Sequence, residues 1–420
     1  MGLSDLKGKK LGICVSGGLD SKTVTKKLKE LGLDVVCFSA DLGQPDEKDI
    51  NDIKKKMAPC GAVTHIIDLK KEMAEACFDI IKCQATYDGG YWNTTGLARA
   101  VTVKGLLGAM KKEGCKVLVH GATGRGNDQM RFERYTKSID PSFEVYAPWR
   151  DAELLKQFKG RTEMAAYLNS FGIEATPGMK KKYSTDANLA GLSHEAEDLE
   201  SVETSCKIVD PIMGVWPEQA PDKTEVFKVK FVKAEAVEIN GKAVTPIEAM
   251  QQANTIGGRN GIWMKNALEN RIIGTKSRGV YEAPGMELLG VCLQSVYQAV
   301  LDRRATKLFN ELSILIADHV YDGRYFDVTA QAARAAINTF AQFANGTVEV
   351  GLYKGNIYFN SLTNCKASLY NEADSSMEDS KGLNPVSSQG YADILSVEAI
   401  AMAKAGQIFT NINKDRKSVV

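Results

Sequence analysis

The residues near the N-terminus that are best suited to chemistry are 15–21, with the sequence VSGGLDS. They follow an apolar run at 11–14 and precede a helical pattern of apolar residues, so the two glycines end a strand and open a helix. Backbone N–H groups at a helix N-terminus bind anions, and glycine allows a close approach. Ser16 and Ser21 add hydroxyl donors for phosphate oxygens. The segment predicts an anion-binding loop; the alternative is a glycine-rich turn without a ligand.

The same segment differs from a Walker A loop. In that loop four residues separate the glycines and a Lys follows the last one, whereas here Gly17 and Gly18 are adjacent and Asp20 stands where the cation would be. The segment instead resembles the SGGxDS pyrophosphate loop of the N-type ATP pyrophosphatases, which split ATP into AMP and pyrophosphate. This resemblance names a superfamily, and other parts of the chain must indicate the substrates.

A second stretch, 121–131, has the sequence GATGRGNDQMR. Asn127 or Asp128 can cap a helix, which would place Arg131 one turn later on the same face. Such a loop suits a zwitterionic amino acid, because a carboxylate can hold its ammonium group and a guanidinium its carboxylate. The alternative is a helix start with a surface ion pair.

A third stretch, 269–282, has the sequence ENRIIGTKSRGVYE. Charged and hydrogen-bonding side chains surround one apolar pair, which is compatible with a surface helix. Tyr281 and the paired acids and bases near Gly279 favour instead a loop that lines a site. The sequence leaves the two interpretations open.

The elements that must position these residues begin with a βαβ pattern. Five short apolar runs read as strands and alternate mostly with amphipathic segments; they lie at 11–15, 35–39, 63–67, 117–120 and 145–147. In a parallel doubly wound sheet, ligands bind beyond the carboxyl ends of the strands. Residues 16–18, 40–44 and 121–124 fall at such ends.

Beyond about residue 175 the pattern becomes α+β. Alternation before Asn240-Gly241 predicts a hairpin, as do two strand-like runs around Gly355. Apolar stripes predict two helices, at 286–303 and 306–321, that pack together, and a C-terminal helix at 393–403. We therefore expect an α/β chain with a doubly wound nucleotide-binding domain at 1–174, an α+β domain at 175–392, and a helix and tail at 393–420.

Composition limits the function classes. The 420 residues carry a formal charge of +1, so no global field favours nucleic acid or an acidic membrane. Nine scattered cysteines favour buried free thiols in a reducing compartment, and four distant histidines give no support for zinc. No run approaches the length of a membrane span. We expect a cytoplasmic protein with no metal site of its own and no nucleic-acid or membrane partner.

Several ordered motifs together resemble the argininosuccinate synthase family, most closely its bacterial branch, from near the N-terminus to about residue 395. The matching stretches are 16–20 (SGGLD), 40–45 (ADLGQP), 91–95 (YWNTT), 120–128 (HGATGRGND), 147–149 (APW), 183–186 (YSTD), 269–271 (ENR) and 276–282 (KSRGVYE). The resemblance implies ATP-dependent ligation of citrulline and aspartate to argininosuccinate, a step of arginine biosynthesis and the urea cycle. AMP and pyrophosphate would be released through a citrullyl-adenylate, with Mg²⁺ on the leaving pyrophosphate, in a homotetramer to which the C-terminal helix contributes.

The resemblance also implies which residues hold each substrate. ATP would contact Ser16, Gly17, Gly18, Asp20, Ser21, Ala40, Gly121 and Asp186. Citrulline would contact Tyr91, Thr95, Asn127, Arg131, Ser184, Ser193, Glu195, Glu269 and Tyr281. Aspartate would contact Thr123, Asn127 and Asp128. The domain at 175–392 would bind the two amino acids and support oligomerisation.

This chemistry requires no covalent nucleophile on the protein, so we nominate no catalytic acid, base or nucleophile and expect positioning and electrostatics to carry the reaction. Three residues depart from the family pattern: Lys22 replaces a hydroxyl residue of the loop, Asn260 replaces a His, and Gly96 leaves any citrulline contact at its position to the backbone. Other enzymes with the same loop, such as a tRNA-thiolating ligase or an amidotransferase, lack support in the sequence. A further alternative is a catalytically silent homologue that binds ATP or citrulline as a sensor.

Overall fold

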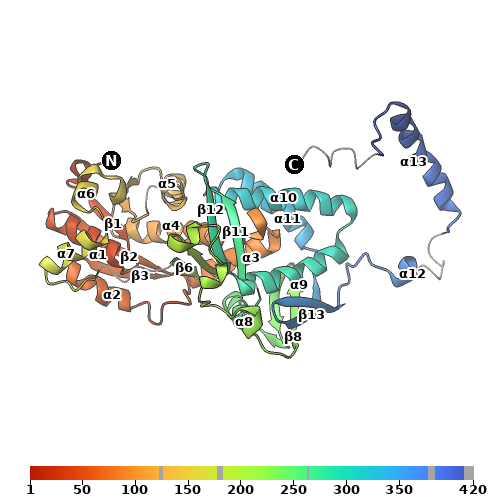
Figure 1. Cartoon of the computed structure of the whole chain (residues 1–420), viewed down its shortest axis with the longest axis horizontal. Coiled ribbons are helices and arrows are strands. Elements are labelled where there is room, and N and C mark those ends of the chain that lie inside the picture. The colour runs from red at the N-terminus through yellow and green to blue at the C-terminus, as the bar shows by residue number, and fades with distance from the viewer. Residues whose placement is uncertain (123–125, 177–182, 263, 377–383, 411–420) are drawn as a thin grey trace. The chain divides into compact units, whose positions relative to one another are not determined.

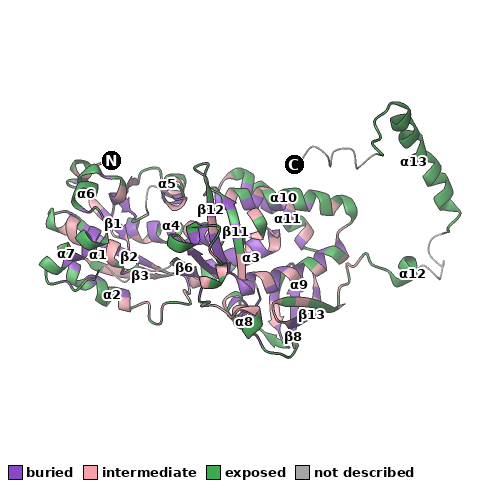
Figure 2. Ribbon diagram, in the orientation of Figure 1, coloured by how far each residue is buried: buried purple, intermediate pink, exposed green. Residues whose placement is uncertain are grey.

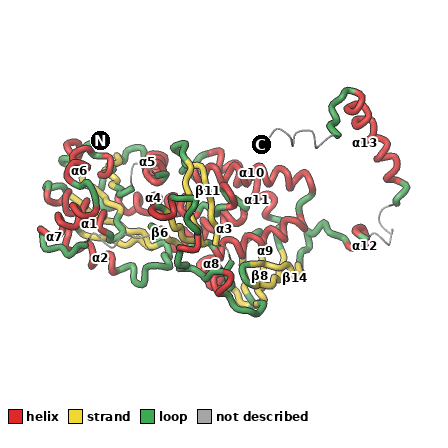
Figure 3. The backbone as a smooth tube through the Cα atoms, in the orientation of Figure 1, coloured by secondary structure: helices red, strands yellow, loops and turns green. Residues whose placement is uncertain are grey.

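The computed structural model describes residues 1–122, 126–176, 183–262, 264–376 and 384–410. The chain divides into two units, Met1–Ala367 and Ser368–Val420, and each is described by itself. Within the described residues, the first unit contains three β-sheets with helices packed against them (Figures 1 and 3).

The first sheet is parallel and doubly wound. Its strands are β1 (Lys10–Cys14), β2 (Asp34–Asp41), β3 (Val63–Asp68), β4 (Val117–Val119) and β5 (Glu144–Tyr146), in the order β3-β2-β1-β4-β5. Alternate side chains point to opposite faces: Val35 and Cys37 join one core, whereas Val36 and Phe38 join another. The five predicted strands and the predicted fold class are confirmed.

Helices cover both faces of this sheet. The first core also receives α1 (Leu19–Glu30), α2 (Asp52–Met57), α6 (Ala152–Gln157) and α7 (Arg161–Ser170). The second core receives α4 (Thr94–Lys112) and α5 (Asp128–Ile139). Both cores are apolar, and Figure 2 shows the buried residues along the strands and inner helix faces. In such a sheet, ligands bind at the edge formed by the carboxyl ends of the strands.

The second sheet is antiparallel and forms one wall of the candidate site. Its strands are β6 (Ser184–Asn188), β7 (Gly191–Glu195), β11 (Met264–Asn270) and β12 (Lys276–Glu282), in the order β11-β12-β7-β6. The stretch 269–282, for which we weighed a surface helix against a lining loop, forms the end of β11, a turn, and all of β12. The lining role is confirmed, because Glu269, Arg271 and Tyr281 line the candidate site, but two strands and a turn carry it instead of a loop. Cross-strand pairing from Met264↔Glu282 to Asn270↔Lys276 overrides the local polarity.

The third sheet confirms the two predicted hairpins. Its strands are β8 (Glu225–Val232), β9 (Glu235–Ile239), β10 (Lys242–Ala243), β13 (Gly346–Tyr353) and β14 (Asn356–Thr363), in the order β10-β9-β8-β13-β14. Asn240 and Gly241 both adopt positive φ in the turn between β9 and β10.

The remaining helices of this unit are α3 (Lys70–Cys83), α8 (Pro246–Arg259), α9 (Pro284–Val300), α10 (Arg303–Tyr321) and α11 (Val328–Ala341). Single turns of 3₁₀ helix lie at Leu3–Leu6, Ala58–Cys60, Asp88–Gly90, Pro148–Arg150, Glu197–Glu200, Cys206–Ile208 and Pro217–Gln219.

The two predicted helices at 286–303 and 306–321 correspond to α9 and α10. They meet where the rings of Tyr297 and Phe309 lie 4.6 Å apart. However, α9 packs mainly along α8, and α10 mainly along α11. The expected pairing of the two is therefore only a minor contact, because each apolar stripe is satisfied by another helix.

The second unit holds α12 (Glu372–Ser375) and α13 (Ser387–Lys404). The predicted helix at 393–403 is confirmed and begins six residues earlier. None of the described residues from 368 onward is buried; Ile394 is 70% exposed and Val397 is 69% exposed. This unit buries no apolar core of its own within the described residues.

Two chain-wide features bear on the sequence expectations. All nine cysteines lie in the described residues and are free thiols, six of them buried, as predicted. No helix among the described residues is long and apolar enough to cross a membrane.

Candidate active site

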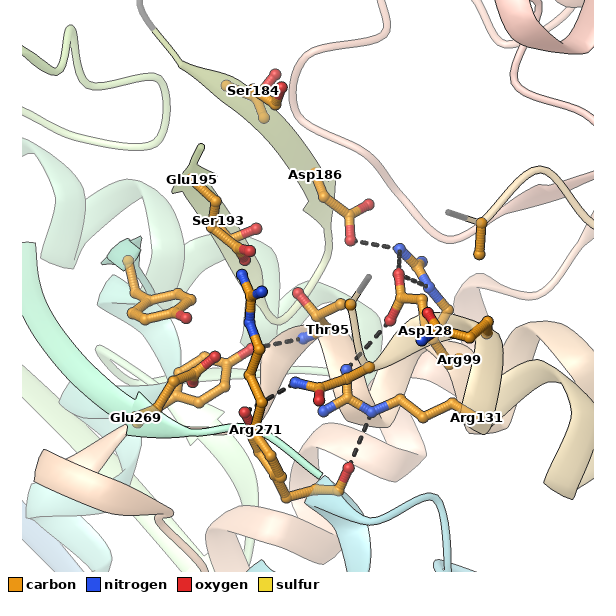
Figure 4. A pocket seen from close by; sticks show the side chains of 18 of the residues that line it. Thr95, Arg99, Asp128, Arg131, Ser184, Asp186, Ser193, Glu195, Glu269 and Arg271 are labelled. Carbon is orange, nitrogen blue, oxygen red and sulfur yellow. Dashed lines mark hydrogen bonds and ion pairs between the residues drawn. The ribbon is translucent and has the colours of Figure 1, made fainter. Parts of the chain in front are cut away.

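A cavity of about 300 Å³ lies between the antiparallel sheet of β6, β7, β11 and β12 and the helices α4 and α5 (Figure 4). Its lining is Tyr91, Thr95, Arg99, Gly121, Ala122, Gly126, Asn127, Asp128, Gln129, Arg131, Ser184, Thr185, Asp186, Ser193, Glu195, Glu269, Arg271, Tyr281 and Tyr321. Charged and hydrogen-bonding side chains dominate this lining, so the cavity suits a polar, charged ligand.

Strand pairing explains the sheet wall of the cavity. Asp186 lies opposite Ser193, which lies opposite Tyr281, and residues directly opposite share a face of the sheet. The residues two positions away, Ser184 and Glu195, are also paired and therefore share that face. The period of two along three strands thus gathers these side chains on one surface.

A glycine on β12 makes room for an aromatic ring on this wall. A Cβ on Gly279 would lie 2.5 Å from Cζ of Tyr281, so the ring of Tyr281 lies back over the glycine. The Tyr281 ring also stacks on Tyr91, with centroids 4.1 Å apart. Tyr91 then accepts a hydrogen bond at its OH from the backbone N–H of Thr95, at 3.0 Å. The two rings join the sheet wall to the start of α4.

The helices α4 and α5 form the opposite wall. Thr95 and Arg99 are one turn apart on α4. Asp128 and Arg131 are one turn apart on α5, and Arg131 Nη1 donates to Asp128 Oδ1 at 3.1 Å. The predicted common face of Asp128 and Arg131 is confirmed. Asn127 occupies the N-cap position, but its side chain does not cap the helix.

The Asn127 side chain instead joins two distant segments. Its Nδ2 donates to Tyr321 OH at 2.8 Å, and its Oδ1 accepts from the Ile272 N–H at 3.0 Å. The Arg131 guanidinium likewise reaches the end of α10, where Nε donates to the Tyr321 carbonyl at 2.9 Å. These contacts fix the start of α5 against α10 and the β11–β12 turn.

Four charged side chains form the polar centre of the cavity (Figure 4). Arg99 Nε donates to Asp128 Oδ2 at 2.9 Å, and Arg99 Nη2 donates to Asp186 Oδ2 at 2.6 Å. Burial opposes ionisation of Asp128, but the guanidinium groups of Arg99 and Arg131 outweigh it and lower its pKa. Burial raises the pKa of Asp186 although Arg99 opposes it. The centre therefore holds a firmly ionised carboxylate beside a less acidic one.

Two carboxyl groups on the sheet wall are hard to ionise. Burial, together with the negative charges of Glu269 and Asp128, raises the pKa of Glu195 to about 7. Burial also raises the pKa of Glu269, against the opposing charge of Arg131. Within the described residues, Glu269 Oε2 and Thr95 Oγ1 are buried without a hydrogen-bond partner. Such atoms favour a bound polar ligand that satisfies them.

The glycine-rich loop has the conformation expected of an anion site. Gly17 has φ +75°, and α1 begins after Gly18 with no side-chain cap on its first N–H groups. The Ser16 N–H donates to Ser21 Oγ at 3.0 Å, which holds the loop closed on the helix. The uncapped N–H groups and the helix dipole leave this end of α1 suited to phosphate.

Comparison with known families identifies the chain. The model described as arginosuccinate synthase N-terminal HUP domain matches residues 10–174, and the model described as arginosuccinate synthase C-terminal domain matches residues 183–402. The chain belongs to the argininosuccinate synthase family. It is therefore an ATP-dependent ligase of citrulline and aspartate in arginine biosynthesis, with a nucleotide-binding HUP domain at its N-terminal end.

The cavity unites the residues that the resemblance to this family implies for the amino acids. All nine residues expected to contact citrulline line it, together with Asp128 for aspartate and Gly121 and Asp186 for ATP. The other expected ATP residues, Ser16, Gly17, Gly18, Asp20, Ser21 and Ala40, do not line this cavity. They lie at or beyond the carboxyl ends of β1 and β2, on the same edge of the sheet as Gly121. Thr123 lies outside the described residues.

Several lining residues were missed from the sequence. They are Arg99, Ala122, Gly126, Gln129, Thr185, Arg271 and Tyr321. A helical pattern after Thr95 could have indicated Arg99, which follows one turn later. No local signal indicates Tyr321, because only the packing of α10 brings it to Asn127.

Among the described residues, no group of three or more His, Cys, Asp or Glu is placed to hold a metal ion.

Proposed function

We propose that this cavity is the site where citrulline and aspartate meet the α-phosphate of ATP, with the pyrophosphate part of ATP at the loop around Gly17. The observation that carries the proposal is that nine residues expected for citrulline, spread from Tyr91 to Tyr281, line one cavity. Residues without a common function would not be expected to gather in one cavity. The cavity also borders Gly121, at the carboxyl edge of the parallel sheet where nucleotides bind.

We assign the two ends of the amino acids by charge. The ionised carboxylate of Asp128 would hold the ammonium group of aspartate, and Arg131 would hold a carboxylate. Glu195 and Glu269, whose ionisation burial makes costly, would gain from the ammonium and ureido N–H groups of citrulline. Binding would thus satisfy the buried atoms Thr95 Oγ1 and Glu269 Oε2.

The chemistry would proceed through a citrullyl-adenylate. The ureido oxygen attacks the α-phosphorus and expels pyrophosphate, and the aspartate amine then displaces AMP. Mg²⁺ would enter with ATP, because Mg²⁺ in proteins is commonly held by substrate phosphates. The protein would supply alignment and charge stabilisation, and it needs no covalent nucleophile.

We further propose a homotetramer in the cytoplasm. Exposed apolar side chains along α13, among them Tyr391, Ile394 and Val397, support a contact with another copy of the chain. Nine free thiols support a reducing compartment. The domain boundaries at 174 and 392 remain proposals as well.

The proposed route is tested by product identity. Purified protein with MgATP, citrulline and aspartate should yield AMP, pyrophosphate and argininosuccinate only when both amino acids are present. ADP in place of AMP would contradict the pyrophosphate-loop assignment. Binding without turnover would favour the silent homologue and make Lys22→Ser the next variant.

The proposed residue roles are tested by how KM responds. Asp128→Asn should raise KM for aspartate about tenfold or more and change KM for citrulline little, because it removes one charge at the aspartate end. Ser193→Ala should raise KM for citrulline and leave KM for aspartate nearly unchanged. Equal effects of both variants on both KM values would contradict the assignment.

A further inference from the structure

Arg99 joins the two walls of the cavity at one point. Its Nε and Nη2 lie 2.9 Å and 2.8 Å from Asp128 Oδ2, on α5, and its Nη2 lies 2.6 Å from Asp186 Oδ2, on β6. The Arg99 side chain is 17% exposed, so these charge-assisted contacts are shielded from water. No substrate role was expected for this residue from the sequence.

Arg99 lies where the ATP side and the aspartate side of the cavity should meet. On the proposed function, on which this inference rests, Asp186 belongs to the ATP side and Asp128 to the aspartate side. The group that must lie between these substrates is the α-phosphoryl group, since it is bonded to citrulline in the intermediate and lies next to the carbon that aspartate attacks. A planar guanidinium matches the oxygens of a phosphoryl group.

The other cations of the cavity are placed differently. Arg131 is held by Asp128 and by the Tyr321 carbonyl, and its guanidinium lies 4.9 Å from the centre of the Tyr321 ring. Arg271 donates to Ser277 Oγ at 2.9 Å. Among the described residues that line the cavity, Arg99 is the cation that contacts both Asp128 and Asp186.

We propose that Arg99 is a catalytic residue that binds the α-phosphoryl group in both half-reactions. In the first, the ureido oxygen bonds to the α-phosphorus, the bond to the bridging oxygen breaks, and pyrophosphate leaves with the electron pair. In the second, the aspartate amine bonds to the ureido carbon, the C–O bond to phosphate breaks with its electron pair on AMP, and the nitrogen loses a proton to solvent. Arg99 stays protonated and neutralises charge on the phosphoryl oxygens throughout.

A direct contact to the α-phosphoryl group predicts a stereochemical signature. The two diastereomers of ATP with sulfur at the α-phosphorus place the sulfur at different non-bridging positions, and only one spares the oxygen that Arg99 contacts. The wild-type enzyme should therefore prefer one diastereomer in kcat/KM by about tenfold or more. Replacing Mg²⁺ by Cd²⁺, which binds sulfur more readily, should leave the preference unchanged in sign.

The Arg99→Lys variant keeps a positive charge but loses the planar fork. We expect it to lower kcat about 100-fold, to reduce the diastereomer preference about tenfold, and to change KM for citrulline less than about threefold. Arg134→Lys is the matched control, because Arg134 lies on α5 outside the cavity lining and pairs with Asp327. It should leave the preference and kcat unchanged, and thermal melting should show that both variants are folded.

Three outcomes would overturn the role of Arg99. They are a wild-type enzyme that accepts both diastereomers equally, a preference that inverts with Cd²⁺, and an undiminished preference in folded Arg99→Lys. The first two need no variant and so do not depend on its folding. Failure of the wild-type enzyme to form AMP and argininosuccinate from unmodified ATP would instead refute the proposed function itself.

Discussion

At the scale of single residues, the cavity holds acids whose ionisation depends on binding. Glu195 is the clearest case, since burial and its acidic neighbours raise its pKa to about 7 from an ordinary value of 4.5. If its carboxylate binds a donor of citrulline, KM for citrulline should fall as pH rises through about 7, because the ionised form then predominates. Glu195→Gln should remove that dependence, and steady-state kinetics between about pH 6 and pH 8 would measure it.

Stability should change with pH in the opposite sense. The folded state holds the proton of Glu195 more tightly than the unfolded state does, so this group lowers the free energy of unfolding as pH rises from 4.5 to about 7. Glu195→Gln should therefore raise the melting temperature at about pH 8 and have little effect at about pH 4.

Glu287→Gln is the matched control for the pH dependence of KM: burial also raises the pKa of Glu287, but it lies outside the cavity lining. It should leave the pH dependence of KM unchanged.

At the scale of elements, the turn from β1 into α1 depends on the backbone of Gly17. An Ala at this position would have to keep φ +75°, which residues with a side chain rarely adopt, and its Cβ would lie 3.2 Å from Cδ of Lys56. Gly17→Ala should therefore distort the loop. We expect KM for ATP to rise about tenfold and stability to fall by about 1 kcal/mol. Kinetics and thermal melting would measure the two effects.

Gly8 supplies the control for this prediction. It has φ +74°, and a Cβ there would meet nothing within 4 Å. Gly8→Ala should therefore cost a similar backbone strain while leaving KM for ATP unchanged. An equal rise in KM for both variants would show that lost stability, and not the loop geometry, causes the effect.

At the scale of the whole molecule, residues 368–420 form a unit with no buried residue among those described, whereas Met1–Ala367 contains the described cores. Removing residues 368–420 should leave the rest folded, because the described cores are made of residues within Met1–Ala367. If α13 contacts another copy, the truncated chain should form smaller assemblies in sedimentation velocity.

A single substitution separates this effect from truncation. Ile394 is 70% exposed, and Ile394→Asp should weaken the assembly by placing a charge in an apolar contact. Ser396 lies two positions away, near the opposite face of α13, and Ser396→Asp should have little effect. An assembly that survives both Ile394→Asp and the truncation would contradict a role for this unit.

What the sequence determined by itself is local. Alternation and apolar runs predicted the five parallel strands and both hairpins, and the paired glycines predicted the strand-to-helix loop, because these depend on neighbouring residues. Local polarity misled where pairing partners decide, as in the hairpin of β11 and β12. The expected substrate residues came from ordered motifs that resemble a family.

Only the tertiary structure decided which side chains meet. Arg99 and Asp186 are 87 positions apart, and Asn127 and Tyr321 are 194 positions apart. No periodicity reports such a contact, because it arises only when elements that are distant in the sequence pack together and their buried polar groups pair. The motif residues were visible in the chain, but the guanidinium of Arg99 between two carboxylates exists only in the folded protein.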